Sequence, residues 1–375
     1  MKIGIVCPYD LSIPGGVQNI VFETHKRLAD RGHATTVISV GPEKRVNIPR
    51  SVFFGKAMPI EFNGAMASMN FGSWATDKQV SSYLKQERFD VVCIHEPIIP
   101  FLNWEVMNVP GLVRVGWFHS TSFGDPLQFP MGIVTEPMQN LLALGLQGKI
   151  AASPTAKHVW RRVFSKGGIV ISAGVDVARF TEALTANLGG LGRIKILFVG
   201  RLDMRKGVLE ILRAFSEVVK SVESELWIVG DGPQFEQAWE LVRNTKIGGR
   251  VRFVGRVAES ELAGYFKAAD IYAAPSLGGE SVGLVLLEAM AAGAPVVAYA
   301  NVGYKYTLTG TPWSGQLVPV KSYKKLAGSI IELAKSAELR QKVADWQREK
   351  VKDFDWEVVT DKFENYLNEV VNSKK

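Results

Sequence analysis

Short apolar runs alternate along this chain with longer stretches in which apolar residues recur every three or four positions. A run of four to eight apolar residues between turn signals is typical of a buried strand, and the longer period is typical of a helix. Strands that alternate with helices predict parallel sheets joined by right-handed crossovers. We therefore predict an α/β fold, with strands at Met1–Cys7, Ala34–Val40, Phe89–His95, Val113–Phe118, Ile194–Gly200, Leu226–Gly230, Arg252–Val254, Ile271–Ala274 and Pro295–Ala298.

The alternating pattern occurs twice, with a glycine-rich interruption around Gly167 between the two series. A chain of 375 residues is longer than most single hydrophobic cores. We therefore predict two α/β domains and interpret the segment SKGGIVISAGVD as the linker between them. The glycine loop after the first strand lacks the G-x-G-x-x-G pattern, which disfavours a dinucleotide-dependent dehydrogenase.

The composition is that of an ordinary globular protein, with 47% hydrophobic and 22% charged residues. The net charge of +7 is too small to indicate nucleic acid binding, and it fits an acidic membrane surface, a phosphate-bearing substrate or a solvated surface. Cys7 and Cys93 fall within predicted strands, so we expect reduced core thiols in a cytoplasmic protein. The sequence holds no uninterrupted apolar segment of about 18 residues, so no membrane span is predicted.

The stretch Ala274–Ala298 combines a polar glycine loop, a helix and a strand. Three glycines in the loop precede an apolar helical stripe that begins at Leu284. A helix N-terminus carries free N–H groups and partial positive charge, so it can bind an anion such as a diphosphate. Glu280 in the loop and Glu288 in the helix would then hold two parts of one polar ligand. In the alternative interpretation, Glu280 caps the helix and Glu288 is a solvated helix residue.

Two further loops carry polar side chains at the carboxyl ends of predicted strands, where open α/β sheets bind their ligands. Arg201 and Lys206 lie between a strand and the helix predicted at Val208–Lys220. Both cations would hold a diphosphate there, although an ordinary solvated basic loop has the same pattern. His119 directly follows the strand Val113–Phe118, which makes it a candidate functional imidazole rather than a structural one.

Five ordered motifs together resemble the family-four retaining glycosyltransferases, which have the GT-B fold. They are GGVQ near the start, HS after an inner strand, GRLDMRKG, the turn GDGP, and the E-x7-E pattern in ESVGLVLLEAMAAGAPVVA. The resemblance covers nearly the whole chain. Within the family, VCPYD with PGGVQ, PIEFNGAMA, IHEP and LGGES resemble the members that transfer mannose from GDP-mannose to phosphatidylinositol.

This resemblance implies two Rossmann-like domains facing across a cleft, with a C-terminal helix that crosses back to the first domain. Residues 1–169 with 355–375 would bind the acceptor, and residues 170–354 would bind the nucleotide sugar. The implied catalytic residues are His119 and Glu280. The implied donor-binding residues are Gly16, Arg201, Lys206, Ser281, Val282, Gly283, Leu284 and Glu288, and the implied acceptor-binding residues are Tyr9, Gln18 and Asn63.

No cofactor or metal is expected, because cations and helix N-termini aimed at the departing diphosphate would stabilise the transition state. The D-x-D of Asp353 and Asp355 is interpreted as a turn. The expected partners are a nucleotide sugar, phosphatidylinositol or another lipid acceptor, and an anionic membrane on whose cytosolic face the protein is peripheral. Retention by a carboxylate nucleophile and retention by same-face attack both stay open.

Departures from the family pattern leave two other functions open. Val282 stands where the family usually has Phe, and Ala173 stands in place of an Asn. The helix predicted around Ala75–Lys85 also has few basic residues, which would weaken docking on an anionic membrane. One alternative is a family member that uses a UDP-sugar and a different lipid or soluble acceptor. The other is a catalytically impaired binding module, against which the retained carboxylates and cations argue.

Overall fold

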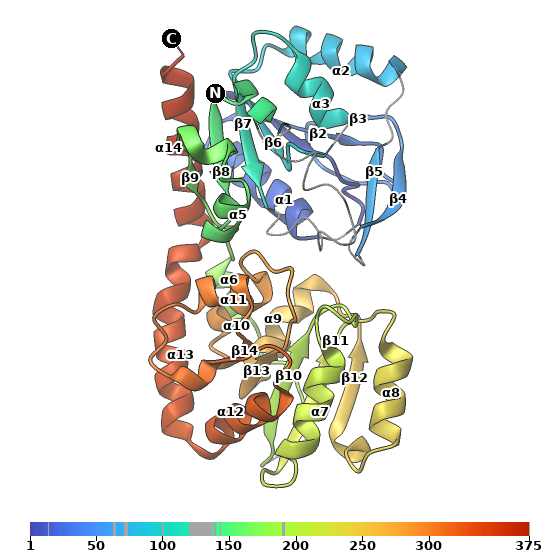
Figure 1. Cartoon of the computed structure of the whole chain (residues 1–375), viewed down its shortest axis with the longest axis vertical. Coiled ribbons are helices and arrows are strands. Elements are labelled where there is room, and N and C mark those ends of the chain that lie inside the picture. The colour runs from blue at the N-terminus through green and yellow to red at the C-terminus, as the bar shows by residue number, and fades with distance from the viewer. Residues whose placement is uncertain are drawn as a thin grey trace. The chain divides into compact units, whose positions relative to one another are not determined.

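The structure is a computed structural model that describes residues 1–13, 15–62, 65–70, 74–99, 101–119, 137, 140–142, 144–189 and 192–374. The chain forms two compact units (Figure 1), Met1–Ala173 with Val359–Lys375, and Gly174–Val358. These boundaries fall a few residues after those expected at 169 and 354. Each unit is a parallel sheet with helices on its faces, so the predicted α/β class with two Rossmann-like domains is confirmed.

The sheet of the first unit has the strand order β3-β2-β1-β6-β7-β8-β9. Its strands are β1 (Lys2–Cys7), β2 (Ala34–Val40), β3 (Ser51–Phe54), β6 (Val91–His95), β7 (Arg114–Phe118), β8 (Gly148–Ala151) and β9 (Ile169–Val170). Every residue of β6 and β7 is buried, as expected of inner strands covered on both faces. Cys7 and Cys93 are buried free thiols, as predicted, and burial raises the pKa of Cys7 to about 12.

Helices cover both faces of this first sheet. The set comprises α1 (Gly16–Asp30), α2 (Trp74–Glu87), α3 (Leu102–Asn108), α5 (Pro154–Val159), η1 (Val163–Lys166) and most of α14 (Trp356–Asn372). A separate antiparallel pair, β4 (Ala57–Phe62) and β5 (Ala65–Asn70), follows β3. The sequence analysis predicted no strand in this stretch, because it shows no continuous apolar run.

The sheet of the second unit has the strand order β12-β11-β10-β13-β14-β15. Its strands are β10 (Ile194–Val199), β11 (Ser224–Val229), β12 (Val251–Gly255), β13 (Ile271–Ala274), β14 (Val296–Tyr299) and β15 (Leu317–Val318). Its helices are α6 (Val177–Glu182), α7 (Val208–Val218), α8 (Phe235–Arg243), η2 (Gly248–Arg250), α9 (Glu259–Ala268), α10 (Leu284–Ala292), α11 (Val302–Thr307), η3 (Ser314–Gln316), α12 (Tyr323–Lys335), α13 (Ala337–Val351) and η4 (Lys352–Phe354). One apolar cluster lies under α7 and α12, and another lies under α9 and α10.

The predicted linker is partly wrong, because Ile169 and Val170 form the edge strand β9. They pair in parallel with Ile150 and Ala151 of β8. β-Branched residues favour strand pairing, but a strand of two residues directly after two glycines is too short to show a periodic pattern.

The last helix, α14, starts in the second unit and continues into the first, which confirms the predicted crossing back. Arg31 at the end of α1 donates to Asp361 at 2.6 Å and to Glu364 at 3.0 Å. The Tyr366 hydroxyl accepts a hydrogen bond from the Lys149 backbone in β8 at 2.8 Å. These contacts hold α14 against the first sheet.

Candidate functional site

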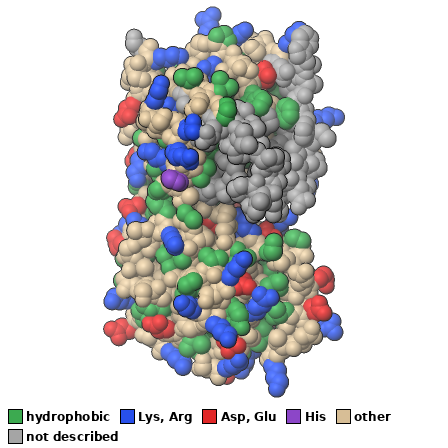
Figure 2. Space-filling view, in the orientation of Figure 1, with side chains coloured by type: hydrophobic (Ala, Val, Ile, Leu, Met, Phe, Trp, Pro, Cys, Tyr) green, Lys and Arg blue, Asp and Glu red, His purple; other side chains and the backbone are tan. Residues whose placement is uncertain are grey.

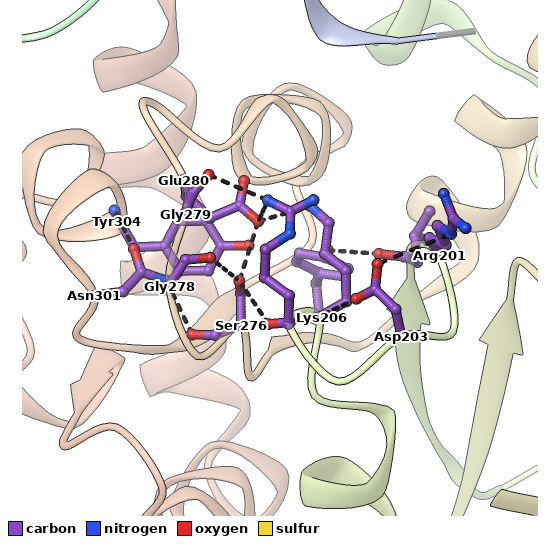
Figure 3. Close-up of polar contacts among 12 residues, drawn as sticks. Arg201, Asp203, Lys206, Ser276, Gly278, Gly279, Glu280, Asn301 and Tyr304 are labelled. Atoms are coloured by element: carbon purple, nitrogen blue, oxygen red, sulfur yellow. Dashed lines mark hydrogen bonds and ion pairs between the residues drawn. The ribbon is translucent and has the colours of Figure 1, made fainter. Parts of the chain in front are cut away.

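Two loops of the second unit meet at the carboxyl ends of the neighbouring strands β10 and β13 (Figure 3). The loop from β10 to α7 carries Arg205 and Lys206, and the loop from β13 to α10 carries Ser276 and Glu280. The backbone N–H of Leu277 donates to the carbonyl of Arg205 at 2.8 Å. The two loops therefore form one hydrogen-bonded unit.

Glu280 is the centre of the charged contacts between these loops. Its Oε1 lies 2.7 Å from the Lys206 ammonium, 3.6 Å from the Arg205 guanidinium and 3.0 Å from the Ser276 hydroxyl. Burial alone would raise the pKa of this carboxyl, but Lys206 and Arg205, together with the Ser276 hydrogen bond, hold it below its usual value of 4.5. Glu280 is therefore an ionised hydrogen-bond acceptor at neutral pH, and it is poorly suited to donate a proton.

The interpretation of Glu280 as a helix cap is wrong, because α10 begins after Gly283. Gly283 has φ of 80°, and a Cβ on it would lie 2.4 Å from the Tyr304 ring. Gly207, which precedes α7, has φ of 78°, and its Cβ would lie 2.2 Å from the carbonyl oxygen of Pro275. Only glycine fits this combination of left-handed backbone and close approach. The two glycines thus let both helices begin beside the charged loops.

Glu288 lies within α10, one turn before its end. The alternative of a solvated helix residue is wrong, because the side chain is half-buried. Burial raises the pKa of Glu288 to about 7, with Arg179 and Lys206 opposing the shift and Glu259 adding to it. Glu280 is thus ionised near neutral pH and Glu288 is partly protonated, although the same E-x7-E sequence motif contains both.

The other predicted donor-binding residues of this unit lie around the same two loops. Arg201 is exposed, and its Nε lies 3.9 Å from Asp203; the same carboxylate accepts the Lys206 backbone N–H at 2.8 Å. Val282 is buried in the core below α10, and its carbonyl accepts a hydrogen bond from Thr307. Ser281 and Leu284 are half-buried.

The D-x-D near the C-terminus has structural contacts. Asp355 accepts backbone N–H groups from Val177 at 3.3 Å and from Glu357 at 2.8 Å. Asp353 lies 3.5 Å from the Lys350 ammonium. Both carboxylates thus have structural partners, and the segment expected to be a turn contains the short 3-10 helix η4 before α14 begins.

His119 lies in the first unit, immediately after β7, and it is 8% exposed. Its Nε2 lies 2.9 Å from Nδ1 of His95, and its backbone N–H donates to the Glu96 carboxylate at 3.1 Å. Burial, together with His95, lowers the pKa of His119 well below 6.5. The imidazole is therefore neutral at physiological pH.

The predicted acceptor residues follow β1. Tyr9 is half-buried, and its carbonyl accepts a hydrogen bond from Ser39; burial raises the pKa of the Tyr9 hydroxyl well above 10. The Gln18 amide donates to the carbonyl of Asp10 at 3.4 Å, and Gly16 is the exposed first residue of α1. Asn63 lies outside the described residues.

The sequence analysis missed several residues that complete these sites. The Ser276 hydroxyl and the Asn301 amide, which donates to the Ser276 carbonyl at 3.0 Å, support the Glu280 loop. In the first unit, His95 and Glu96 contact His119 directly. Both residues belong to the motif IHEP. Its position at the end of a predicted strand could have indicated a functional role, but the sequence analysis assigned none to it.

Comparisons with known proteins show which family the chain is similar to. The family model described as Glycosyltransferase Family 4 matches residues 14–179, and the model described as Glycosyl transferases group 1 matches residues 185–350. The phosphatidyl-myo-inositol mannosyltransferase of Mycolicibacterium smegmatis is 36% identical over 96% of this chain and 92% of its own. The protein of the same name from Mycobacterium tuberculosis (strain H37Rv) is 33% identical over 100% and 98% of the two chains.

Among solved structures, sucrose-phosphate synthase from Thermosynechococcus elongatus superposes with a TM-score of 0.80 over 99% of both chains. At 21% identity, this likeness concerns the fold alone.

Proposed function

This chain belongs to glycosyltransferase family 4, and from that premise we propose that it transfers mannose from GDP-mannose to the inositol ring of phosphatidylinositol. The reaction would make a phosphatidylinositol mannoside with retained configuration at the sugar carbon. The observation that carries the proposal is the 36% identity, over nearly the full length of both chains, to a protein named phosphatidyl-myo-inositol mannosyltransferase.

The second unit has the chemistry that a sugar diphosphate requires. Breaking the bond between the sugar and the diphosphate builds negative charge on the departing phosphate. Lys206 and Arg201, together with the N–H groups at the start of α10, would stabilise that charge. Because Lys206 contacts Glu280, the same ammonium would couple the phosphate end of the donor to the sugar end.

The two carboxylates of this unit fit neutral hydroxyl groups. Glu280 is ionised and accepts hydrogen bonds, so it would hold hydroxyls of the sugar. Glu288, further along α10, would accept the ribose hydroxyls. A carboxylate with two oxygens can bind both hydroxyls of a ribose, and these contacts would orient the sugar carbon for attack.

The first unit supplies the residues proposed for the acceptor. His119 is buried and neutral, so its imidazole can accept or donate a hydrogen bond to a sugar or inositol hydroxyl. Tyr9 lies just after β1, and Gly16 and Gln18 lie in the first turn of α1, which follows the same strand. We expect the inositol phosphate to contact this region.

A lipid acceptor requires contact with a membrane, and we propose peripheral docking on an anionic cytosolic surface. Basic side chains gather on the first unit over α5 and η1 (Figure 2), where the segment Lys157–Lys166 contains no acidic residue. In the part of the chain that the structure describes, no helix has the length and apolar character needed to cross a bilayer.

The second candidate keeps the fold and changes the donor to a UDP-sugar. The observation that favours it is Val282, whose buried aliphatic side chain replaces the aromatic residue that the family usually has there. An altered wall beside Glu280 would change which sugar fits. The donor base is therefore part of the proposal and is tested together with the sugar.

The proposal is tested by GDP release from GDP-mannose with and without phosphatidylinositol vesicles. We expect release to depend on the lipid, and we expect Glu280→Gln and His119→Ala each to lower turnover by about a hundredfold or more. Glu240→Gln, an exposed change on α8, is the control and should keep wild-type turnover. Release that needed a soluble acceptor instead of the lipid would contradict the acceptor assignment, and unchanged turnover in both site variants would contradict the site.

A further inference from the structure

Three aromatic side chains meet where β6 and β7 end. His95 is the last residue of β6, its register partner in β7 is Trp117, and His119 follows β7. Both His95 and Trp117 are completely buried, and His119 is nearly so. His119, which is proposed to contact the acceptor, therefore packs against two fully buried rings of the core.

The two imidazoles lie edge to edge in one plane. Their planes differ by 1°, their ring centres are 5.1 Å apart, and Nδ1 of His95 lies 2.9 Å from Nε2 of His119. The distance between the ring centres is close to the N···N distance plus the two ring radii, so the hydrogen bond lies along the line that joins the two ring centres. The centre of the Trp117 ring lies 5.3 Å from the centre of the His95 ring and 5.5 Å from that of the His119 ring, and its plane is tilted by 23° from each imidazole. This packing keeps the two imidazoles coplanar.

The backbone around the pair is fixed by side-chain hydrogen bonds. The buried Asn103 amide donates to the carbonyls of His95 at 3.0 Å and Glu96 at 2.8 Å. Glu96 in turn accepts the backbone N–H of His119 at 3.1 Å. These bonds connect the ends of β6 and β7 independently of the imidazoles.

A hydrogen bond between two neutral imidazoles requires one proton between the facing nitrogens. If Nδ1 of His95 carries that proton, Nε2 of His119 must lack one, and His119 then carries its proton on Nδ1. If Nε2 of His119 carries it, Nδ1 of His95 is the acceptor. The two rings are therefore either both Nδ1–H or both Nε2–H tautomers, so the tautomer of His119, and with it the role of its Nδ1 as donor or acceptor, is coupled to the tautomer of His95.

Nδ1 of His119 is the ring nitrogen left for a substrate. Among the described residues, neither this atom nor Nε2 of His95 has a hydrogen-bond partner, although both are buried. Burial lowers the pKa of His95 to about 3 and that of His119 well below 6.5, so the pair stays neutral at physiological pH.

We propose that His95 is a positioning residue whose hydrogen bond couples the tautomer of His119 to its own and holds the His119 ring in its orientation for sugar transfer. The proposal rests on the transferase function given above and on the role assigned there to His119. A histidine that merely filled the core would be replaceable by another ring of similar size, because packing alone needs no hydrogen bond.

The test compares His95→Phe, which keeps a ring beside Trp117 but loses the hydrogen bond, with His95→Asn, whose amide places a polar atom near the former Nδ1. We expect His95→Phe to lower kcat about 10- to 100-fold, the range known for residues that orient metal-bound histidines through a hydrogen bond, with the KM for each substrate changed less than about threefold. His95→Asn should recover part of the loss. The matched control is His25→Phe, which removes another buried histidine, bonded to Thr35 at 2.9 Å.

Selective ¹⁵N labelling of the five histidines provides a second readout, and it does not depend on activity. We expect the resonances of His95 and His119 to report the same tautomer in the wild-type protein, and that of His119 to change in His95→Phe. Opposite tautomers in the wild type, or wild-type kcat in His95→Phe, would overturn the proposal. Loss of activity in His95→Phe alongside a wild-type enzyme that mannosylates an acceptor other than phosphatidylinositol would support His95 and overturn only the acceptor.

Discussion

The environment of Glu288 disfavours the ionised form of its carboxyl group. Its pKa rises from 4.5 to about 7 through burial, so between these values the folded chain holds a proton that the unfolded chain has lost. The free energy of unfolding therefore decreases as the pH rises through this window. A neutral amide of the same shape avoids the penalty.

We predict that Glu288→Gln is more stable than the wild type near pH 8, by about 2 kcal/mol, and that the difference shrinks toward about pH 5. This free-energy difference is smaller than the value that the full pKa shift would give, because the half-buried side chain keeps some contact with solvent. Melting temperatures of both proteins across this pH range measure the effect. Glu240→Gln should show no such trend, and a Glu288→Gln difference that was constant with pH would contradict the assignment. The same variant should bind the donor nucleotide more weakly.

The residues of the site could be predicted from the sequence better than their charge states. The spacing of Glu280 and Glu288 after a glycine loop indicated two ligand-binding carboxylates. However, the ionisation of Glu280 depends on Lys206, which is 74 positions away in the chain. The pairing of His95 with His119 likewise needs the register of β6 against β7. Such contacts arise from tertiary structure, which local spacing does not encode.

At the scale of elements, the loop between β10 and α7 lies very close to the loop between β13 and α10. Gly207 has φ of 78°, and any Cβ there would press on the Pro275 carbonyl at 2.2 Å. That carbonyl is backbone and cannot rotate away as a side chain would. The segment that positions Lys206 therefore depends on this glycine.

We predict that Gly207→Ala lowers the free energy of unfolding by about 3 kcal/mol, through left-handed strain and the clash with Pro275, and that it weakens donor binding. Thermal unfolding and nucleotide titration measure the two effects. Gly249→Ala is the matched control, because nothing lies within 4 Å of its Cβ position and its φ is not positive. A melting temperature for Gly207→Ala within about 1 °C of the wild type would show that the loop relaxes freely.

The elements that the sequence predicted are those with a continuous apolar run or a clear helical period, such as β6, β10 and α7. The elements it missed are short or lie at edges. β9 has two residues, and β4 with β5 forms a separate antiparallel pair. β9 gains its stability by pairing with β8, about 20 positions earlier in the chain, and β4 and β5 pair with each other without a continuous apolar run to mark them.

At the scale of the molecule, the proposed reaction draws on both units. The second unit holds the loops proposed for the nucleotide sugar, and the first holds His119 and the residues proposed for the inositol lipid. α14 belongs to both, and its contacts with Arg31 and Lys149 fasten it to the first sheet. Two sheets with separate cores explain why the two halves of the sequence each resemble a complete α/β pattern.

The most direct test of the account is product identification by mass spectrometry after incubation with phosphatidylinositol vesicles and a panel of nucleotide sugars that includes GDP-mannose and UDP-glucose. The account predicts a phosphatidylinositol carrying one added hexose with GDP-mannose, absent with Glu280→Gln. A glycosylated product formed from a UDP-sugar, or on another acceptor while phosphatidylinositol stayed unmodified, would contradict it.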